Sequence, residues 1–320
     1  MKNKPFLLAI FLYFILLIIA LYVSWVYYQD NVRQVEIETQ SALALEVDIK
    51  KTLMDKKLST TETEILFLAG TGRLKLALDT LKTSWAELGS NVSKHLYALY
   101  VKNNSHKQKS KLINAKSGSN YDMLHETLHT LLYELKQKSH YKNILLLDMQ
   151  GNVIYDVEKG SYFTSNIRHK NINLSKVFEE VVKSKTHEKQ EQVMYRDFST
   201  NDGSFFVTVI ADEKGEKIGV LAFEIDQKII NKIAKLKAVE KNNCIEKSTK
   251  KENTFLSTAC LNYQDNYWLI QSEAEMDKIL SPIKEASLKH IVLMFGIGFL
   301  ALFFGYTILA RFLGKGEEDE

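Results

Sequence analysis

Two long apolar runs, one near each end of the sequence, constrain this chain more than any other feature. They cover residues 6–28 and 291–312, and the one charged side chain in them is Arg311, at the very end of the second run. A helix of about 20 apolar residues crosses a bilayer core of roughly 30 Å. Both runs are therefore predicted to be transmembrane helices, with the whole polar middle of the chain on one side of a membrane.

The charges that flank these runs predict the orientation. Lys2 and Lys4 precede the first run, whereas acidic residues follow it, and positive charge is retained on the cytoplasmic side. Both termini are then cytoplasmic and the middle is extracytoplasmic. A cleaved signal peptide is the alternative, but the run exceeds the usual 7–15 apolar residues and lacks an Ala-x-Ala site. Trp25, Tyr27 and Tyr28 suit the outer membrane interface.

Composition and motifs exclude several function classes. The sequence has 42 basic and 39 acidic residues, a net charge of +3, so it lacks the basic stripe of a nucleic-acid-binding protein. Gly70-Thr71-Gly72 is too short for a phosphate-binding loop, and no Gly-x-Ser-x-Gly motif occurs. We therefore expect neither a nucleic-acid partner, nor an enzyme, nor a bound cofactor.

Helical periodicity dominates the first half of the outer region. Apolar residues keep helical spacing over 30–57, 65–100 and 121–138, whereas 102–119 is aperiodic and predicted to be a mobile loop. The first of these segments has a stripe with alternating spacing of three and four. That stripe is compatible with pairing to a twin helix or with packing on the chain's own domain; its members are Val32, Val35, Thr39, Ala42, Glu46, Ile49 and Leu53.

The pattern changes to strand spacing at Tyr141. Strands are predicted over 144–147, 153–157, 193–198, 204–211 and 217–225, separated by turn clusters, with short helices over 174–183 and 229–236. Two strands, a helical crossing and a three-strand meander make a PAS-like five-stranded antiparallel sheet. The predicted fold class is α+β, with two transmembrane helices flanking this domain.

The residues of this module resemble the Cache sensor domains of bacterial chemoreceptors (methyl-accepting chemotaxis proteins) and related sensor kinases and cyclases. The resemblance rests on the runs 143–155 and 217–225, on Tyr121-x3-His125-x3-His129 upstream, and on Asp197-Phe198 before the meander. It covers roughly 65–238, and 267–273 is similar to the last strand of such receptors. It implies a PAS-like sheet that binds a small ligand.

Departures from the family pattern accompany the resemblance. The segment between Ala238 and Ile291 offers at most two strands, 254–260 and 267–273, so we expect the second PAS-like module to be reduced or absent. The pattern also leads us to expect no cytoplasmic output domain after Phe312. The predicted organisation is a stub with the first transmembrane helix (1–28), a helical region (29–140), the Cache module (141–238), a reduced hairpin with an exit helix (239–290), the second transmembrane helix (291–313) and a cytoplasmic tail (314–320).

Candidate ligand-binding residues come from one helix face and from the sheet. Tyr121, His125 and His129 are spaced i, i+4 and i+8, so they share a face. They can hydrogen-bond a small anion or polar metabolite, or they can be satisfied polar groups at a helix–sheet seam. Zinc or haem binding is not expected, because no third ligand is evident. The candidates on or beside strands are Tyr155, Lys159, Arg196, Asp197 and Phe206; Arg196 and Asp197 can also be a solvated surface pair.

Two smaller features complete the analysis. Cys244 and Cys260 both fall in the proposed extracytoplasmic part, where disulfides persist, so they form either a bridge or two small unpaired apolar residues. Ala301 and Gly305, with Gly298 nearby, permit close approach of helices in the membrane. That motif favours a homodimer whose transmembrane helices shift on ligand binding, although glycine is also common in ordinary membrane helices.

These observations predict a two-pass protein of the inner (plasma) membrane with a periplasmic Cache domain. It is expected to bind a small-molecule ligand and to signal through a separate cytoplasmic or membrane protein, as in chemotaxis. The alternative is a structural tether that holds an envelope complex and binds no metabolite.

Overall fold

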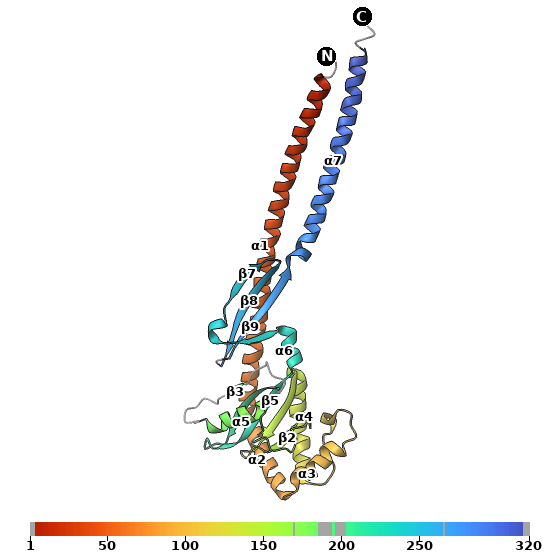
Figure 1. Cartoon of the computed structure of the whole chain (residues 1–320). Helices are drawn as coiled ribbons and strands as arrows, with labels where there is room; N and C mark the ends of the chain where they lie inside the picture. Colours follow the sequence, from red (N-terminus) through yellow and green to blue (C-terminus); the bar gives the residue numbers. More distant parts are fainter. Residues whose placement is uncertain (1–3, 169, 185–193, 196–202, 265, 316–320) are drawn as a thin grey trace. The chain divides into compact units, whose positions relative to one another are not determined.

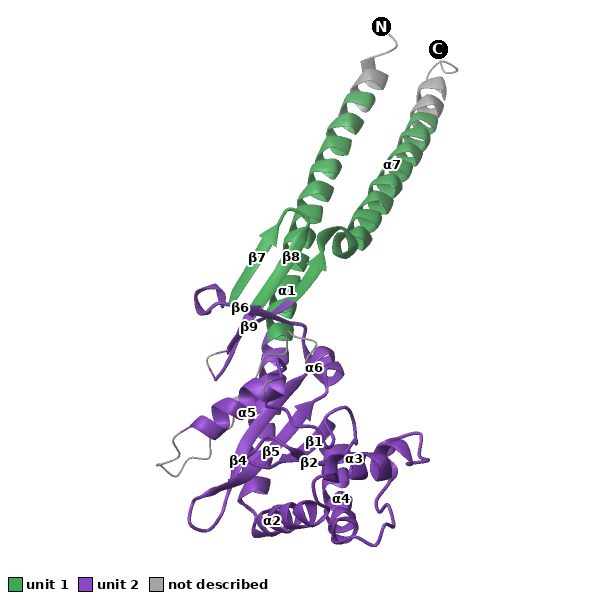
Figure 2. Ribbon diagram, turned by 60° about the horizontal axis from the view of Figure 1, so that its bottom comes forward, with its two compact units in different colours: residues 1–47, 246–258, 272–320 green, residues 48–245, 259–271 purple. Residues whose placement is uncertain are grey.

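The chain forms two compact units, each assembled from segments far apart in the sequence. The computed structural model describes residues 4–168, 170–184, 194–195, 203–264 and 266–315. Unit 1 comprises residues 1–47, 246–258 and 272–320, and unit 2 comprises 48–245 and 259–271 (Figure 2). Helix α1 (Lys4–Gly70) and strands β8 (Thr254–Tyr263) and β9 (Asn266–Glu275) contribute residues to both units (Figure 1).

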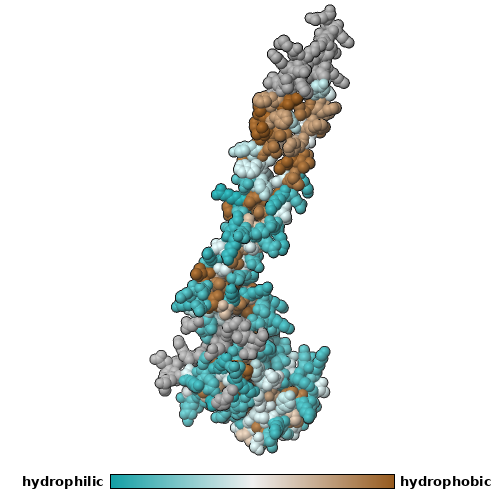
Figure 3. All heavy atoms as spheres, in the orientation of Figure 1, coloured by the Kyte–Doolittle hydropathy of each residue, from teal (hydrophilic) through white to brown (hydrophobic). Residues whose placement is uncertain are grey.

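Unit 1 contains two helices long and apolar enough to cross a membrane. These are α1 and α7 (Met276–Lys315), and the apolar window of each is unburied within the protein. Figure 3 shows hydrophobic residues gathered on these helices. Outside the apolar windows, Leu43 of α1 packs with Phe255, Met276 and Leu280 in a small core.

The two apolar helices touch at a glycine. A Cβ atom added at Gly298 would lie 3.0 Å from the ring of Tyr13, so the missing side chain allows this contact. A Cβ added at Gly305 would have no described atom within 4 Å. Near the start of α7, Pro282 has no backbone N–H and cannot donate to the carbonyl of Lys278. The Ser281 hydroxyl donates to that carbonyl instead, at 3.1 Å.

The predicted five-stranded antiparallel sheet is present in unit 2. Its strands are β1 (Tyr141–Leu147), β2 (Val153–Asp156), β3 (Met194–Tyr195), β4 (Ser204–Ala211) and β5 (Lys217–Ile225), in the order β2-β1-β5-β4-β3. The β1–β2 turn forms because Asp148 accepts from the backbone N–H groups of Gln150 and Asn152, and Gly151 adopts a φ of +85°.

One face of this sheet is covered by α5 (Asn173–Lys183). Its bounds agree closely with those of the helix predicted over 174–183. Val177, Phe178 and Val181 pack on apolar side chains of β1, β4 and β5. Lys217 closes the end of the helix, because its ammonium donates to the carbonyls of Val181, Val182 and Ser184 at 3.1, 2.9 and 2.6 Å. The last carbonyls of a helix lack the backbone donors of a following turn, so Lys217 satisfies acceptors at the end of α5.

The opposite face is covered by α2 (Gly72–Glu87) and α4 (Asn120–Ser139), with α3 (Val92–Tyr97), a π-helical turn (Ala98–Lys102) and a 3-10 turn (Lys109–Lys111) between them. Helix α2 approaches the sheet at Gly219. A Cβ added there would lie 2.6 Å from Leu78 and 2.7 Å from the backbone oxygen of Leu147. The sheet therefore needs glycine at this position.

We expect Gly219→Ala to destabilise unit 2 by about 1–3 kcal/mol, because the backbone oxygen of Leu147 is fixed by strand pairing and cannot yield. Gly72→Ala is the matched control, since a Cβ at Gly72 meets nothing within 4 Å, and helical alanine is more favourable than glycine. Urea unfolding of both variants checks this. Equal stabilities would contradict the proposed close contact.

A second antiparallel sheet has the order β6-β9-β8-β7, with β6 at Leu236–Val239 and β7 at Lys247–Lys251. The sequence-based limit of two strands here is wrong. Strand β7 is lysine-rich and lacks apolar alternation, and β6 is only four residues long, so neither carries the pattern by which a strand is predicted. The predicted helix over 229–236 is also wrong at its end: α6 spans Gln227–Ile233, and Leu236 pairs with Ile270. Cys244, after a 3-10 turn at Lys241–Asn243, forms a disulfide with Cys260, which confirms the bridged alternative.

The predicted helix boundaries before the sheet need correction. Instead of helices over 30–57 and 65–100, α1 continues to Gly70 and α2 begins after Thr71, whose hydroxyl caps it by accepting from the backbone N–H of Leu74. In the predicted stripe, Val32 and Val35 pack within unit 1. Ile49 and Leu53 are exposed, so this part of the stripe has no partner within the described chain.

Candidate functional site

Three predicted residues line one buried face of α4. Tyr121, His125 and His129 are at most 1% exposed, as their spacing predicts for one helix face. The two imidazole rings stack with centroids 4.8 Å apart. The Tyr121 hydroxyl donates to the carbonyl of Ile154 at 2.8 Å. Helix α4 begins here because Ser119 accepts from the backbone N–H of Asp122.

A β-bulge brings Tyr155 to the same place. Leu147 pairs with Val153 and Leu146 with Tyr155, which leaves Ile154 as an extra residue in β2. Regular alternation would put Val153 and Tyr155 on one face, whereas a bulge changes which face a side chain occupies. Val153 therefore joins the α5-side core, and the Tyr155 hydroxyl reaches His129 Nδ1 at 2.8 Å.

The segment predicted to be a mobile loop supplies two acceptors to this cluster. The Ser110 carbonyl oxygen lies 2.7 Å from His129 Nε2, and the Ile113 carbonyl oxygen lies 2.6 Å from His125 Nδ1. Asn104 is buried and donates to the carbonyls of Tyr100 and Lys109, both at 2.9 Å. These bonds hold the aperiodic segment against α4, so it contributes to the candidate site, and its mobility stays a prediction.

These contacts determine where the imidazole protons lie. A carbonyl only accepts, so His125 carries its proton on Nδ1 and His129 carries its proton on Nε2. His125 Nε2 is then a buried acceptor, and it has no hydrogen-bond partner among the described residues. Burial, with the nearby Lys159 charge, lowers the pKa of His129 to about 4 and that of His125 well below its usual value. Both rings are neutral at pH 7.

Lys159 lies beside the imidazoles as a buried cation, with its ammonium 6.0 Å from the centroid of the Tyr100 ring. It is 2% exposed, and its φ of +54° is unusual for a residue with a side chain. Its ammonium is 3.4 Å from the Val157 carbonyl oxygen and 3.5 Å from His129 Nε2. Since His129 Nε2 is itself a donor, the second contact is not a good hydrogen bond. Burial lowers the pKa of Lys159 to about 7.

Asp156 holds the turn that carries Lys159. Its carboxylate accepts from the Asn143 amide at 2.9 Å and from the backbone N–H groups of Lys159 and Gly160 at 2.8 and 3.2 Å. Burial raises the pKa of Asp156 to about 6, although these hydrogen bonds oppose the shift. The strained backbone and the buried lysine are both unfavourable, and such features concentrate at functional sites.

An open polar pocket of about 760 Å³ adjoins this cluster. Its wall includes Ser110 and Gly160, which border His129 and Lys159 in the cluster. Side chains of both signs line it and partly pair with one another. Lys136 lies 2.6 Å from Glu158, and Lys142 lies 2.5 Å from Glu224. The pocket is thus a solvent-accessible approach to the segment that holds Lys159.

The structure brings together five of the eight predicted site residues: Tyr121, His125, His129, Tyr155 and Lys159. Phe206 does not join them, because it lies on β4 with its ring 5.9 Å from that of Tyr263. Arg196 and Asp197 lie outside the described residues. No group of three potential metal ligands occurs in the described ranges.

Sequence reasoning missed Tyr100 and the carbonyls of Ser110 and Ile113. The ring of Tyr100 lies 4.4 Å from that of His125 and is presented by the π-helical turn, and such turns are frequent at functional sites. A backbone carbonyl leaves no signal in side-chain chemistry. Only the tertiary structure identifies these groups.

Comparisons with known proteins give a likeness of fold. No family model matches the chain, and no curated protein matches it. An extracellular ligand binding receptor from Desulfohalobium retbaense is 11% identical with a TM-score of 0.35; the match covers 61% of this chain and 39% of that one.

Two sensor domains match over most of their own length. The ligand-binding domain of the Campylobacter jejuni chemoreceptor Tlp3, in complex with 4-methylisoleucine, is 12% identical with a TM-score of 0.40, covering 77% of this chain and 94% of that one. The E. coli DcuS sensor domain is 14% identical with a TM-score of 0.24, covering 47% and 97%. The chain is similar to such sensor domains in fold, at values too low to carry an argument about its ligand.

Proposed function

We propose that this chain is a membrane-anchored sensor that binds a small polar metabolite at the cluster around Lys159. In this proposal α1 and α7 cross the membrane and unit 2 is extracytoplasmic. The proposal joins two apolar helices to a buried polar cluster with an adjacent open pocket. Catalysis is not part of it.

The observation that carries the proposal is a pair of buried polar groups, one poorly hydrogen-bonded and one without a partner among the described residues. The Lys159 ammonium has one long hydrogen bond to a carbonyl, and His125 Nε2 has no partner among the described residues. A buried donor or acceptor that lacks a hydrogen-bond partner destabilises the protein by about 1–3 kcal/mol, and by more when the group is charged. A ligand that supplies an acceptor to Lys159 and a donor to His125 recovers this free energy.

The chemistry of these groups indicates the class of ligand. A carboxylate or phosphate oxygen suits the Lys159 ammonium, and a hydroxyl or ammonium group suits His125 Nε2. The pocket adds Lys142 and Glu224, one of each charge. We therefore propose a small metabolite that carries an anionic group together with a hydrogen-bond donor.

A change in unit 2 has a continuous route toward the membrane. Helix α1 runs from the predicted transmembrane segment into unit 2, and β9 leads directly into α7. Ligand binding then favours one of two arrangements of these elements, and a signalling protein on the cytoplasmic side responds. The exposed Ile49 and Leu53 suit pairing of α1 with a second copy in a homodimer.

The test is a thermal-shift screen of the full chain in detergent micelles against amino acids, mono- and dicarboxylates and phosphate esters. A ligand at 100 times its Kd adds about 2.7 kcal/mol to the stability of the folded state, which raises the Tm by several degrees. We expect a hit whose shift disappears in Lys159→Met.

Lys82→Met is the matched control. Lys82 is half-buried in the same unit and donates to the carbonyl of Ile218 at 3.1 Å, outside the cluster. This variant should keep the ligand-induced shift. The absence of any shift across the library would favour the alternative, a structural tether, whereas a shift that persists in Lys159→Met would move the site elsewhere.

A further inference from the structure

The balanced charge of the whole chain conceals a strongly basic segment in unit 2. Residues 88–119, which include α3, the π-helical turn and the 3-10 turn, contain six lysines but no acidic residue and no arginine. Figures 1 and 2 both show the connection from α3 to α4 at an edge of unit 2, away from the five-stranded sheet. Positive charge is therefore concentrated on one segment at the edge of this unit.

Five of the six lysines of this segment are exposed: Lys94, Lys102, Lys107, Lys111 and Lys116. None of these five has an ion pair with another described residue. The sixth, Lys109, is half-buried and donates to the carbonyl of Asn104. Five ammonium groups are thus available to an external anion.

The carboxylates beside the segment do not neutralise it. Asp122 is buried. Glu87 accepts from the side-chain amide of Asn120 at 3.0 Å, and Glu126 accepts from that of Asn114 at 2.8 Å. These three carboxylates are therefore buried or held by neutral donors, and the exposed lysines keep their full charge.

The segment has a buried side and an exposed side. Its buried side is attached to α4, because the carbonyl oxygens of Ser110 and Ile113 contact His129 and His125 at 2.7 and 2.6 Å. Ser110 is buried, whereas its neighbour Lys111 is exposed. The contacts within unit 2 thus use backbone groups of the segment and leave its lysines to solvent.

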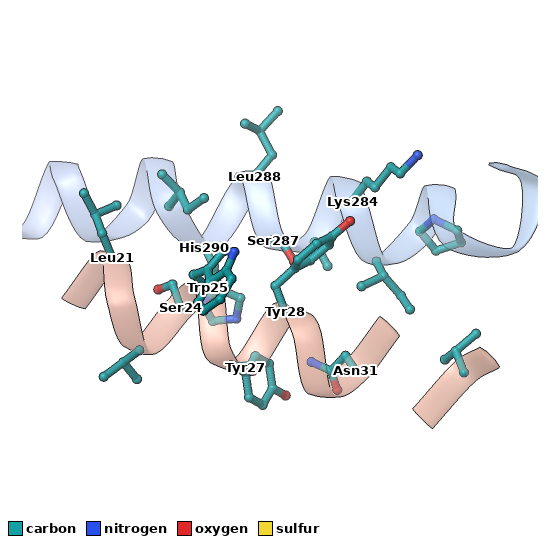
Figure 4. A pocket seen from close by; sticks show the side chains of 16 residues that line it. Leu21, Ser24, Trp25, Tyr27, Tyr28, Asn31, Lys284, Ser287, Leu288 and His290 are labelled. Atoms are coloured by element: carbon teal, nitrogen blue, oxygen red, sulfur yellow. The ribbon is translucent and has the colours of Figure 1, made fainter. Parts of the chain in front are cut away.

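The opening between α1 and α7 in unit 1 is different in this respect. It has a volume of about 750 Å³, and Figure 4 shows polar and apolar side chains mixed along it, with the Lys284 side chain directed away from it. That lysine is paired with Asp277 at 3.3 Å. The opening therefore has no concentration of free ammonium groups like that of residues 88–119.

The residue types favour a flexible polyanion as the partner. Arginine recognises carboxylates and phosphates in a fixed, bidentate geometry, whereas lysine is a point charge on a flexible stem, and the segment has lysine alone. Lysine is also depleted in protein–protein interfaces. Single-stranded nucleic acids need stacking aromatic side chains as well, and of the two tyrosines in the segment only Tyr97 is exposed.

We propose that residues 88–119 bind an acidic polysaccharide, a linear polymer that carries carboxylates on its sugars. Successive carboxylates neutralise successive lysines and release counterions, so the affinity comes from the number of charge contacts and needs no enclosed pocket. The choice of a polysaccharide rests on the extracytoplasmic placement of unit 2 proposed above. The metabolite site is independent of it, because none of the five exposed lysines belongs to the cluster around Lys159.

The test is fluorescence anisotropy of labelled polygalacturonate, titrated with the full chain in non-ionic detergent micelles. We expect binding that weakens about ten-fold or more between about 50 and 200 mM NaCl, whereas neutral dextran should not bind. The variant Lys94→Gln/Lys102→Gln/Lys107→Gln/Lys111→Gln should bind polygalacturonate about ten-fold more weakly or worse. A metabolite-induced thermal shift without polygalacturonate binding would reject this proposal and leave the proposed sensor function intact.

The matched control is Lys56→Gln/Lys170→Gln/Lys214→Gln/Lys235→Gln, which removes the same charge from exposed positions elsewhere in unit 2. It should bind polygalacturonate as the wild type does. Equal weakening in the two variants would reveal a general attraction to positive charge and overturn the proposal, and so would binding of dextran. Tighter binding of poly-L-glutamate or of oligothymidylate, compared at equal charge, would instead assign the segment to an acidic protein or to a nucleic acid.

Discussion

Lys159→Met should stabilise unit 2 at pH 7, by about 1–4 kcal/mol. The substitution removes a cation that is 2% exposed and has one long hydrogen bond, and methionine retains most of the buried chain. The opposite result is usual for a residue of the core, where truncation or replacement costs stability. A gain in stability together with a loss of ligand binding is typical of a functional residue kept at a cost.

The pH dependence of this difference follows from the lowered pKa. Lys159 has a pKa of about 7 in the folded protein and 10.5 as its ordinary value. Between these values the unfolded chain binds the extra proton, so the wild type gains stability as pH rises, at up to about 1.4 kcal/mol per pH unit. The advantage of Lys159→Met is therefore largest at pH 7 and shrinks toward pH 10.

Urea unfolding of the full chain in micelles, at several pH values from 7 to 9.5, checks both statements. Trp85 is a local probe, since its ring lies 6.5 Å from that of Tyr121; Trp25→Phe and Trp268→Phe remove the other two signals. Lys82→Met supplies the control for loss of a half-buried lysine outside the cluster. A Lys159→Met chain that is less stable than the wild type at pH 7 would refute the description of Lys159 as a poorly hydrogen-bonded cation.

Reduction of the Cys244–Cys260 disulfide should remove about 3 kcal/mol of stability from the second sheet. The two cysteines are 16 residues apart in the sequence, and closing a loop of about that length in the unfolded chain has this effect. The sheet depends on it because its apolar core is small. Cys244 joins the β6–β7 connection to strand β8, and its sulfur also lies 3.5 Å from the carbonyl oxygen of Trp268.

The measurement is thermal unfolding followed by Trp268 fluorescence with and without dithiothreitol, in a Trp25→Phe/Trp85→Phe background. Cys244→Ser/Cys260→Ser should resemble the reduced wild type and should not respond to dithiothreitol. An unchanged melting curve on reduction would show that strand pairing alone supports the sheet.

The sequence predicted those parts of the chain in which polar and apolar side chains recur at helix or strand spacing. The i, i+4, i+8 spacing placed Tyr121, His125 and His129 on one buried helix face, and strand alternation with turn clusters predicted the five-stranded sheet. Apolar side chains at fixed intervals are the usual signature of such elements. Strand β7 carries lysines instead of alternating apolar residues, and β6 is only four residues long, so the second sheet was predicted as a hairpin.

The candidate site was predictable only in part, because some of its polar groups are backbone carbonyls, which the side-chain types in the sequence do not reveal. The carbonyls of Ser110 and Ile113 come from a segment without periodicity, and they decide which nitrogen of each histidine carries the proton. Lys159 was a candidate from its position beside a strand. Its isolation depends on Asp156, which directs its carboxylate to backbone N–H groups rather than to the ammonium.

The extra residue Ile154 in β2 has a consequence for how this protein can diverge. By turning Tyr155 away from Val153, the bulge gives the two faces of one sheet different tasks: the α5 side holds the fold together, and the α4 side carries the polar cluster. Substitutions at the cluster leave the apolar side untouched. Related chains can therefore acquire new chemical preferences on the α4 side while the same core continues to fold.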